Sequence, residues 1–92
     1  MAIQSIEDLA GNRGVVIVND TDEYTPATGI DSIMVLEDTV FNTLKIDGAD
    51  VLSTYVTTPA TAVRAGALIV PVAPAYFSAV DLTSGSVAVI LR

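Results

Sequence analysis

Histidine, cysteine and tryptophan are absent from the 92 residues, and the only lysine is Lys45. Without cysteine there are no disulfides and no thiol nucleophiles. Without histidine, the usual zinc ligand and the side chain that titrates near pH 7 are also missing. The sequence therefore predicts no enzyme, and we identify no catalytic, cofactor-binding or metal-binding residue in it.

Basic residues are also scarce: four Lys and Arg face eleven Asp and Glu, and the net charge is −7. Lys and Arg supply most of the affinity for phosphate groups, so we expect no direct binding to nucleic acid or to an anionic membrane. The longest uncharged apolar run spans residues 65–77 and contains Gly66, Pro71 and Pro74. A membrane-spanning helix needs about 20 apolar residues, and we expect none here. The acids Glu7 and Asp8 precede the first basic residue, so we also expect no signal peptide.

β-Branched residues dominate what is present, since Val, Ile and Thr make up about a third of a chain that is 51% hydrophobic. Such residues pack well on a pleated sheet. We predict a mainly β fold, a compact antiparallel β-sandwich or small barrel of about seven short strands with one short N-terminal helix. The expected strands are residues 15–18, 33–36, 40–46, 51–56, 67–72, 77–82 and 87–91.

Two parts of the chain are expected. Residues 1–13 form an N-terminal arm with a short helix, in which Ser5 is the N-cap and Gly11 the stop signal. Residues 14–92 form a single β domain. Within it, residues 15–18 are expected to be a buried strand, and residues 87–91, apolar on both faces, a central one.

Turn signals separate the expected strands. Asp47-Gly48 predicts a hairpin turn, and Gly85 predicts a second hairpin between the last two strands. Residues 19–31 read as a polar surface loop that Tyr24 and Ile30 anchor. The acids at its start lack the EF-hand pattern, because Thr25 occupies the sixth position where glycine is required. A solvated acidic loop is the favoured interpretation, and cation binding by residues 20–31 stays open.

The chain is more apolar than so small a domain can readily bury, which points to a partner. The strongest candidate is the proline-containing segment at residues 68–77. We predict that it forms an interface between copies of the chain, through Leu68, Ile69, Val70, Val72, Tyr76 and Phe77. The alternative is that the segment consists of two core-facing strands joined by a proline-rich corner.

The C-terminal two thirds of the chain carry a recurrent cadence of strands and glycine turns. It runs through DTVFNTLKIDGADVL at residues 38–52, AGALIVP at 65–71 and FSAVDLTSGSVAV at 77–89. This cadence resembles small β-rich structural proteins of tailed bacteriophages. The resemblance implies a capsid cement, or decoration, protein made in the host cytoplasm. Such a protein sits on the outer surface of the virion, where it binds the major capsid protein, often as a homotrimer.

Residues 1–29 depart from that cadence, and they are interpreted as a capsid-docking arm. Ile3, Ile6 and Leu9 are its expected contact residues, the alternative being that they close one end of the barrel. Two other functions stay open. One is a tail, neck or fibre-attachment module, and the other is a carbohydrate-binding module, which would normally present more aromatic residues than three Tyr and two Phe.

Overall fold

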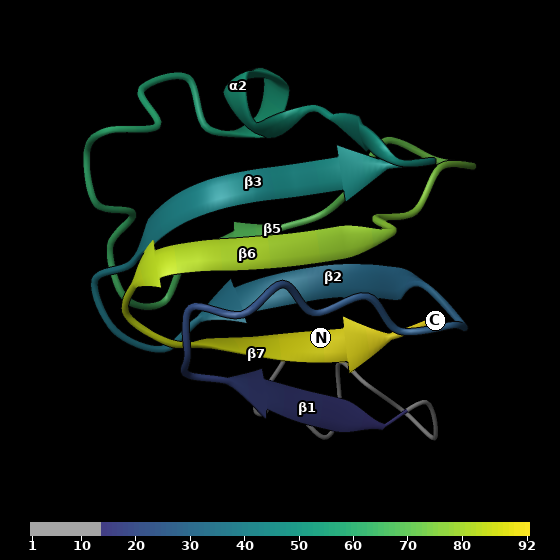
Figure 1. The fold of residues 1–92 in the computed structure, drawn as a ribbon, viewed down its shortest axis with the longest axis horizontal. Coiled ribbons are helices and arrows are strands. Elements are labelled where there is room, and N and C mark those ends of the chain that lie inside the picture. The colour runs from purple at the N-terminus through teal and green to yellow at the C-terminus, as the bar shows by residue number, and fades with distance from the viewer. Residues whose placement is uncertain (1–13) are drawn as a thin grey trace, which may run out of the picture.

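Seven strands and one helical turn follow one another along residues 14–92, the part of the chain that the structure, a computed structural model, describes (Figure 1). They are β1 (Val15–Val18), β2 (Ile30–Val35), β3 (Val40–Ile46), β4 (Ala49–Asp50), α2 (Leu52–Tyr55), β5 (Leu68–Ile69), β6 (Ala79–Ser84) and β7 (Val87–Leu91). The predicted arm at residues 1–13, with its short helix and with Ile3, Ile6 and Leu9, lies outside the described residues.

The strands form two antiparallel sheets. The first has the order β1-β7-β2-β5, and the second has the order β4-β3-β6. The two sheets do not close into a barrel. The predicted mainly β, antiparallel fold is therefore confirmed in its sandwich form.

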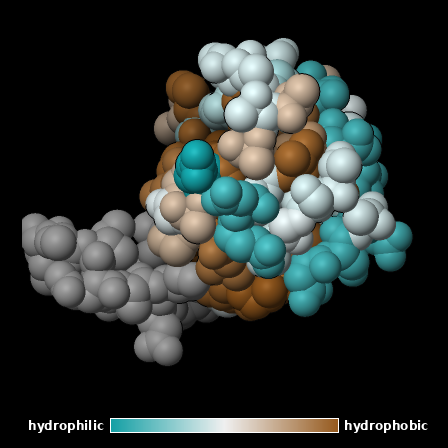
Figure 2. Space-filling model, turned by 90° about the vertical axis from the view of Figure 1, so that its left-hand side faces the viewer, coloured by the Kyte–Doolittle hydropathy of each residue, from teal (hydrophilic) through white to brown (hydrophobic). Residues whose placement is uncertain are grey.

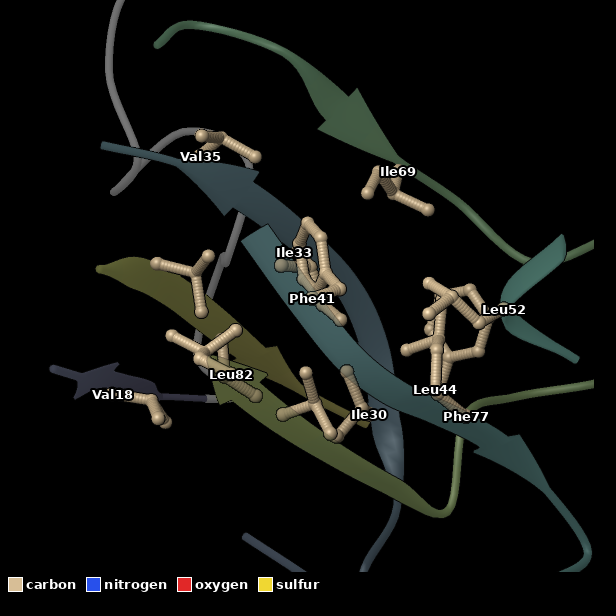
Figure 3. Packing of buried hydrophobic residues seen from close by; sticks show 13 residues of the cluster. Val18, Ile30, Ile33, Val35, Phe41, Leu44, Leu52, Ile69, Phe77 and Leu82 are labelled. Carbon is tan, nitrogen blue, oxygen red and sulfur yellow. The ribbon is translucent and has the colours of Figure 1, made fainter. Parts of the chain in front are cut away.

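One hydrophobic cluster joins the two sheets (Figure 3). Ile33 and Val89 enter it from the first sheet, Leu44 and Leu82 from the second, and Phe77 from the segment before β6; all five are essentially buried. Full burial of one such side chain contributes about 1.5–3 kcal/mol relative to exposure. These contacts fix which face of each strand points inward, and hence which side chains are left outside.

Strand β7 occupies the interior of the first sheet, as its sequence predicts. It pairs with β1 through Val16↔Val89 and with β2 through Ile33↔Val89. The residues from Val87 to Ile90 are all fully buried. A strand whose side chains are buried on both faces is typical of the interior of a sheet, and β7 has a paired strand on each side.

The predicted turn at Asp47-Gly48 is confirmed, but the strand expected after it is not. Asp47 and Gly48 have φ values of 51° and 80° and connect β3 to the two-residue β4. Residues 51–56, expected as a strand, instead contain α2. The Asp50 carboxylate accepts a hydrogen bond from the Leu52 amide at 3.0 Å, which favours a local turn over a strand ladder.

The second predicted hairpin is also wrong, although its glycine turn is present. Gly85, with φ of 93°, connects β6 to β7, but these strands belong to different sheets. A Cβ at Gly85 would collide with the Thr39 side chain and backbone. This close approach lets the chain cross from one sheet to the other instead of folding back on itself.

Strand β1 differs from its prediction in position. It is an edge strand of the first sheet, and Ile17 on it is 52% exposed while Val18 is buried. Four successive apolar residues carry no alternation from which an edge could be recognised.

Candidate interaction surface

The predicted interface segment lies at one edge of the first sheet. Its strand, β5, is shorter than expected and pairs only with β2, through Ile33↔Ile69 and Met34↔Leu68. Pro71 follows two residues later, in keeping with the preference of proline for sheet edges. The segment therefore lies at the rim of the sheet, where exposed residues alternate with the buried residues Ile69, Pro71 and Phe77.

The six predicted interface residues differ in burial and fall into three groups. Ile69 and Phe77 are buried in the core of the same chain, so their side chains are not presented to a partner. The aliphatic side chains of Leu68, Val70 and Val72 are 41%, 53% and 73% exposed. Tyr76 is half-buried. Ile69 and Phe77 therefore lie as the alternative interpretation expects, with their side chains facing the core.

Phe77 anchors the end of this segment. Its amide and carbonyl exchange hydrogen bonds with those of Ile30, at 3.1 and 2.8 Å. Its ring meets the Tyr55 ring edge-on, with centroids 5.1 Å apart. The Tyr55 hydroxyl in turn accepts a hydrogen bond from the Val72 amide at 3.1 Å. The backbone of the exposed segment is thus tied to the core at two points while Val72 projects outward.

Tyr76 is held by contacts on two sides. A Cβ at Gly29 would collide with its ring, so the glycine permits the ring to lie directly on the backbone. The Arg92 guanidinium stands 4.1 Å from the ring centroid, in a cation–π arrangement. The Arg92 amide also donates to the Gly29 carbonyl at 3.1 Å. Gly29 and Arg92 thus hold the Tyr76 ring between them.

A hollow of about 380 Å³ lies between β5 and the helical turn α2. Ala67, Leu68 and Ile69 line it from the strand side, Tyr55 and Val56 from the helical turn, and a threonine-rich loop closes it. The loop residues are Thr57, Thr58, Thr61, Ala62 and Val63. Viewed from the left-hand side of Figure 1, the molecule shows hydrophobic patches bordered by hydrophilic ones (Figure 2). The apolar edge and this hollow are neighbouring parts of one surface.

Each basic side chain among residues 14–92 makes an ion pair or a cation–π contact. Lys45 Nζ lies 2.9 Å from a Glu23 oxygen, and Arg64 lies 3.7 Å from Asp38. The hydrogen bond and charge of Glu23 raise the pKa of Lys45 above its ordinary value, with smaller contributions from Asp50 and Asp81 against the opposing effect of desolvation. The third basic residue of this range, Arg92, lies over the Tyr76 ring. The other charged side chains of residues 14–92 are all acidic.

The acidic loop forms a surface turn. The Asp22 amide donates to the Asp20 carboxylate at 3.2 Å, and the loop lines a hollow of about 250 Å³ together with β1. Within residues 14–92 no group of three or more acidic or other ligating side chains converges in a way that could hold a metal ion. Tyr24 and Ile30 anchor the loop as predicted, Tyr24 through paired hydrogen bonds to Val80.

Two exposed aliphatic side chains lie outside the predicted interface, Ile17 on β1 and Leu36 after β2. The exposure of these two side chains could not be predicted from the sequence, because each belongs to a continuous apolar run without alternation. No helix among the described residues has the length and apolar character to cross a membrane. No protein-family model, curated protein or solved structure matches the chain.

Proposed function

We propose that the chain is a non-enzymatic virion structural protein, a capsid cement protein of a tailed bacteriophage. In this proposal copies of the chain associate, as a trimer, and bind the major capsid protein on the outer surface of the shell. The observation that carries the proposal is the row of aliphatic side chains at Leu68, Val70 and Val72. They lie outside the core on one edge of the sandwich, where they are available to a protein partner.

The character of this edge favours a defined assembly over open-ended strand pairing. β5 contributes two residues to the sheet, and Pro71 removes a backbone donor just beyond it. A standard interface buries about 800 Å² on each partner, a substantial part of the 5216 Å² that this chain exposes. Side-chain packing on the aliphatic row and the adjoining hollow would supply part of such an area, and the residues around them would supply the rest.

The resemblance of residues 38–89 to small phage structural proteins supports the choice of partner. Cement proteins need a rigid domain, a surface for self-association and a surface for the shell. A domain that binds only the assembled lattice stabilises that lattice by mass action. The acidic surface supports the same role, because it disfavours binding to packaged nucleic acid.

The distribution of aromatic residues favours this proposal over a carbohydrate-binding module. Sugar-binding platforms present flat, accessible rings. Here Tyr24, Tyr55 and Tyr76 are all half-buried. Tyr24 packs against the hydrophobic cluster, the Tyr55 ring meets Phe77 edge-on, and the Tyr76 ring lies under Arg92.

The proposal is tested on particles produced from the genome that encodes the chain. We expect peptide mass spectrometry of purified particles to detect the chain in many copies, and immunogold labelling to place it on the capsid shell. Particles lacking the gene should lose DNA at a lower temperature than particles that retain it. Labelling confined to the tail or neck would favour the tail-module alternative, and absence from the particles would overturn a virion role.

A further inference from the structure

The two edge strands of the first sheet both carry exposed aliphatic side chains. At one edge, Leu68 on β5 is followed by Val70 and Val72, and at the other edge Ile17 projects from β1. Among residues 14–92, β1 pairs only with β7, and β5 pairs only with β2. The sheet therefore offers two separate apolar edges, with its other two strands between them (Figure 1).

The β1 edge adjoins acidic side chains. Beside Ile17, the acidic loop brings Asp20, Asp22 and Glu23 to the hollow of about 250 Å³ that β1 also lines. Glu23 is paired with Lys45, but neither Asp20 nor Asp22 forms an ion pair with a described residue. This edge therefore carries two carboxylates that no described cation neutralises.

A cation lies beside the β5 edge. Arg64 precedes Leu68 by four residues, and its carbonyl accepts a hydrogen bond from the Ala67 amide at 3.3 Å, which keeps Arg64 next to β5. The Arg64 side chain is 87% exposed, and its guanidinium approaches Asp38 only to 3.7 Å. Ion pairs between groups this exposed are weak, so Arg64 remains available to an acidic partner.

The proposed trimer needs two different surfaces on each copy. A patch that meets an identical patch on its partner produces a twofold dimer, whereas a ring of three is closed by contacts between two different patches. The aliphatic row at β5 supplies only one of these patches. The edges of a four-stranded sheet lie about 14 Å apart, so β1 and β5 cannot meet within one chain.

We infer that the β5 edge of one copy docks on the β1 edge of the next copy. The aliphatic row of one copy packs against Ile17 of its neighbour, and Arg64 faces the neighbour's acidic loop. Burial of the aliphatic side chains supplies affinity, and the opposite charges determine which edge meets which. This inference rests on the proposed self-association and names the two surfaces through which it occurs.

Contacts between identical edges are less favourable. Two β1 edges in contact would bring two acidic loops together, and like charges across an interface oppose association. Two β5 edges in contact would leave the carboxylates of Asp20 and Asp22 without a cation. The charges therefore favour the pairing of unlike edges.

Two variants, each of which damages one edge, test this pairing. I17D places a charge at the β1 edge and V70D places one at the β5 edge; both side chains are more than half exposed, so both variants should stay folded. We expect each variant alone to be monomeric by native mass spectrometry. Mixed in equal amounts, the two should form a 1:1 dimer, because each keeps the edge that the other lacks. I17S replaces I17D if circular dichroism shows that I17D is unfolded.

The mixed dimer also isolates the charge contact. It contains one copy of the contact, to which the I17D chain contributes its β5 edge. R64Q in that chain should raise the dissociation constant about two- to fivefold and reduce its dependence on salt, as expected for an exposed ion pair. R64Q in the V70D chain is the matched control, because the β5 edge of that chain is not used. Equal effects of R64Q in the two chains would overturn the charge contact.

The outcomes separate this inference from the proposed assembly. A wild-type chain that is monomeric at every concentration would overturn both. An assembly that survives in I17D, or a mixture of the two variants that yields no dimer, would overturn the pairing of edges alone. Wild-type oligomers that keep growing with concentration would contradict the trimer and support the pairing, since contacts between different patches form open filaments where they do not close.

Discussion

Thr39 and Ser86, 47 positions apart in the sequence, are hydrogen-bonded at the corner where the chain passes between the two sheets. The Thr39 hydroxyl oxygen accepts a hydrogen bond from the Ser86 amide at 3.1 Å. Its hydrogen is within reach of the Glu37 carbonyl at 2.8 Å and the Ser86 carbonyl at 3.2 Å. The Ser86 hydroxyl donates to the Glu37 carboxylate at 2.7 Å. One buried side chain therefore links the start of β3 to the start of β7.

Replacing Thr39 by valine tests this link. T39V keeps the shape of the side chain but leaves the buried Ser86 amide without its acceptor, which costs about 1–3 kcal/mol. We expect the free energy of unfolding, measured by urea denaturation, to fall by that amount. The matched variant T39S keeps the hydroxyl and should lose less. Equal losses in the two variants would contradict a dominant role for the hydroxyl, because removal of the methyl group would then cost as much as removal of the hydrogen bonds.

Two glycines with positive φ, one in the β3–β4 turn and one at the Thr39 corner, are predicted to differ in the cost of substitution. Gly48 and Gly85 both have positive φ, and a side chain there is strained by roughly 1–2 kcal/mol. Nothing lies within 4 Å of a Cβ at Gly48, whereas a Cβ at Gly85 would collide with Thr39. We expect G48A to lower the unfolding free energy by about the strain alone and G85A to lower it further. Thermal or urea unfolding of both variants measures the difference, and similar losses would contradict the collision.

Glu23 is predicted to control the ionisation of Lys45. Because folding raises the pKa of Lys45, the folded chain holds this proton more tightly. The resulting stabilisation is fully present below the unfolded pKa and is lost as the pH rises through the folded value. In an NMR titration, E23Q should move the pKa of Lys45 back toward its ordinary value. D22N removes an adjacent acid that does not contact Lys45, and it should have little effect; equal effects of the two variants would implicate general surface charge.

Neighbouring residues of the predicted interface segment should respond in opposite ways. I69A removes a buried side chain and should cost about 2–5 kcal/mol of unfolding free energy. V72A changes a side chain that is 73% exposed and should stay within about 0.5 kcal/mol in the dissociated chain. Urea unfolding in a V70D background, in which a charge on the exposed aliphatic row should dissociate the assembly, gives both values. A large loss for V72A would place Val72 in the fold and remove it from the proposed interface.

The sequence predicts the fold class and the central strand, because both depend on local composition and pattern. The residues from Val87 to Leu91 are apolar on both faces, and this alone requires cover on both sides. The turn at Asp47-Gly48 is likewise local, since it depends on residues that tolerate positive φ.

The remaining features depend on contacts between distant residues. Gly85 looks like a hairpin glycine until Thr39 is placed against it, 46 positions away in the sequence. β-Branched residues near Leu52 suggest a strand, but the Asp50 carboxylate favours a helical turn. Within residues 68–77, the alternation that separates Ile69 from Leu68 and Val70 becomes visible only when β5 is paired with β2. The edge was therefore predictable, whereas the inward and outward residues were not.

The measurement that tests the proposed assembly most directly is the solution mass of the purified chain. Native mass spectrometry from micromolar to nanomolar concentrations should show a persistent species of about three times 9.5 kDa. In V72D, which places a charge on the aliphatic row, that species should dissociate into folded monomers. A wild-type chain that is monomeric at every concentration, or a V72D chain that remains trimeric, would contradict the account.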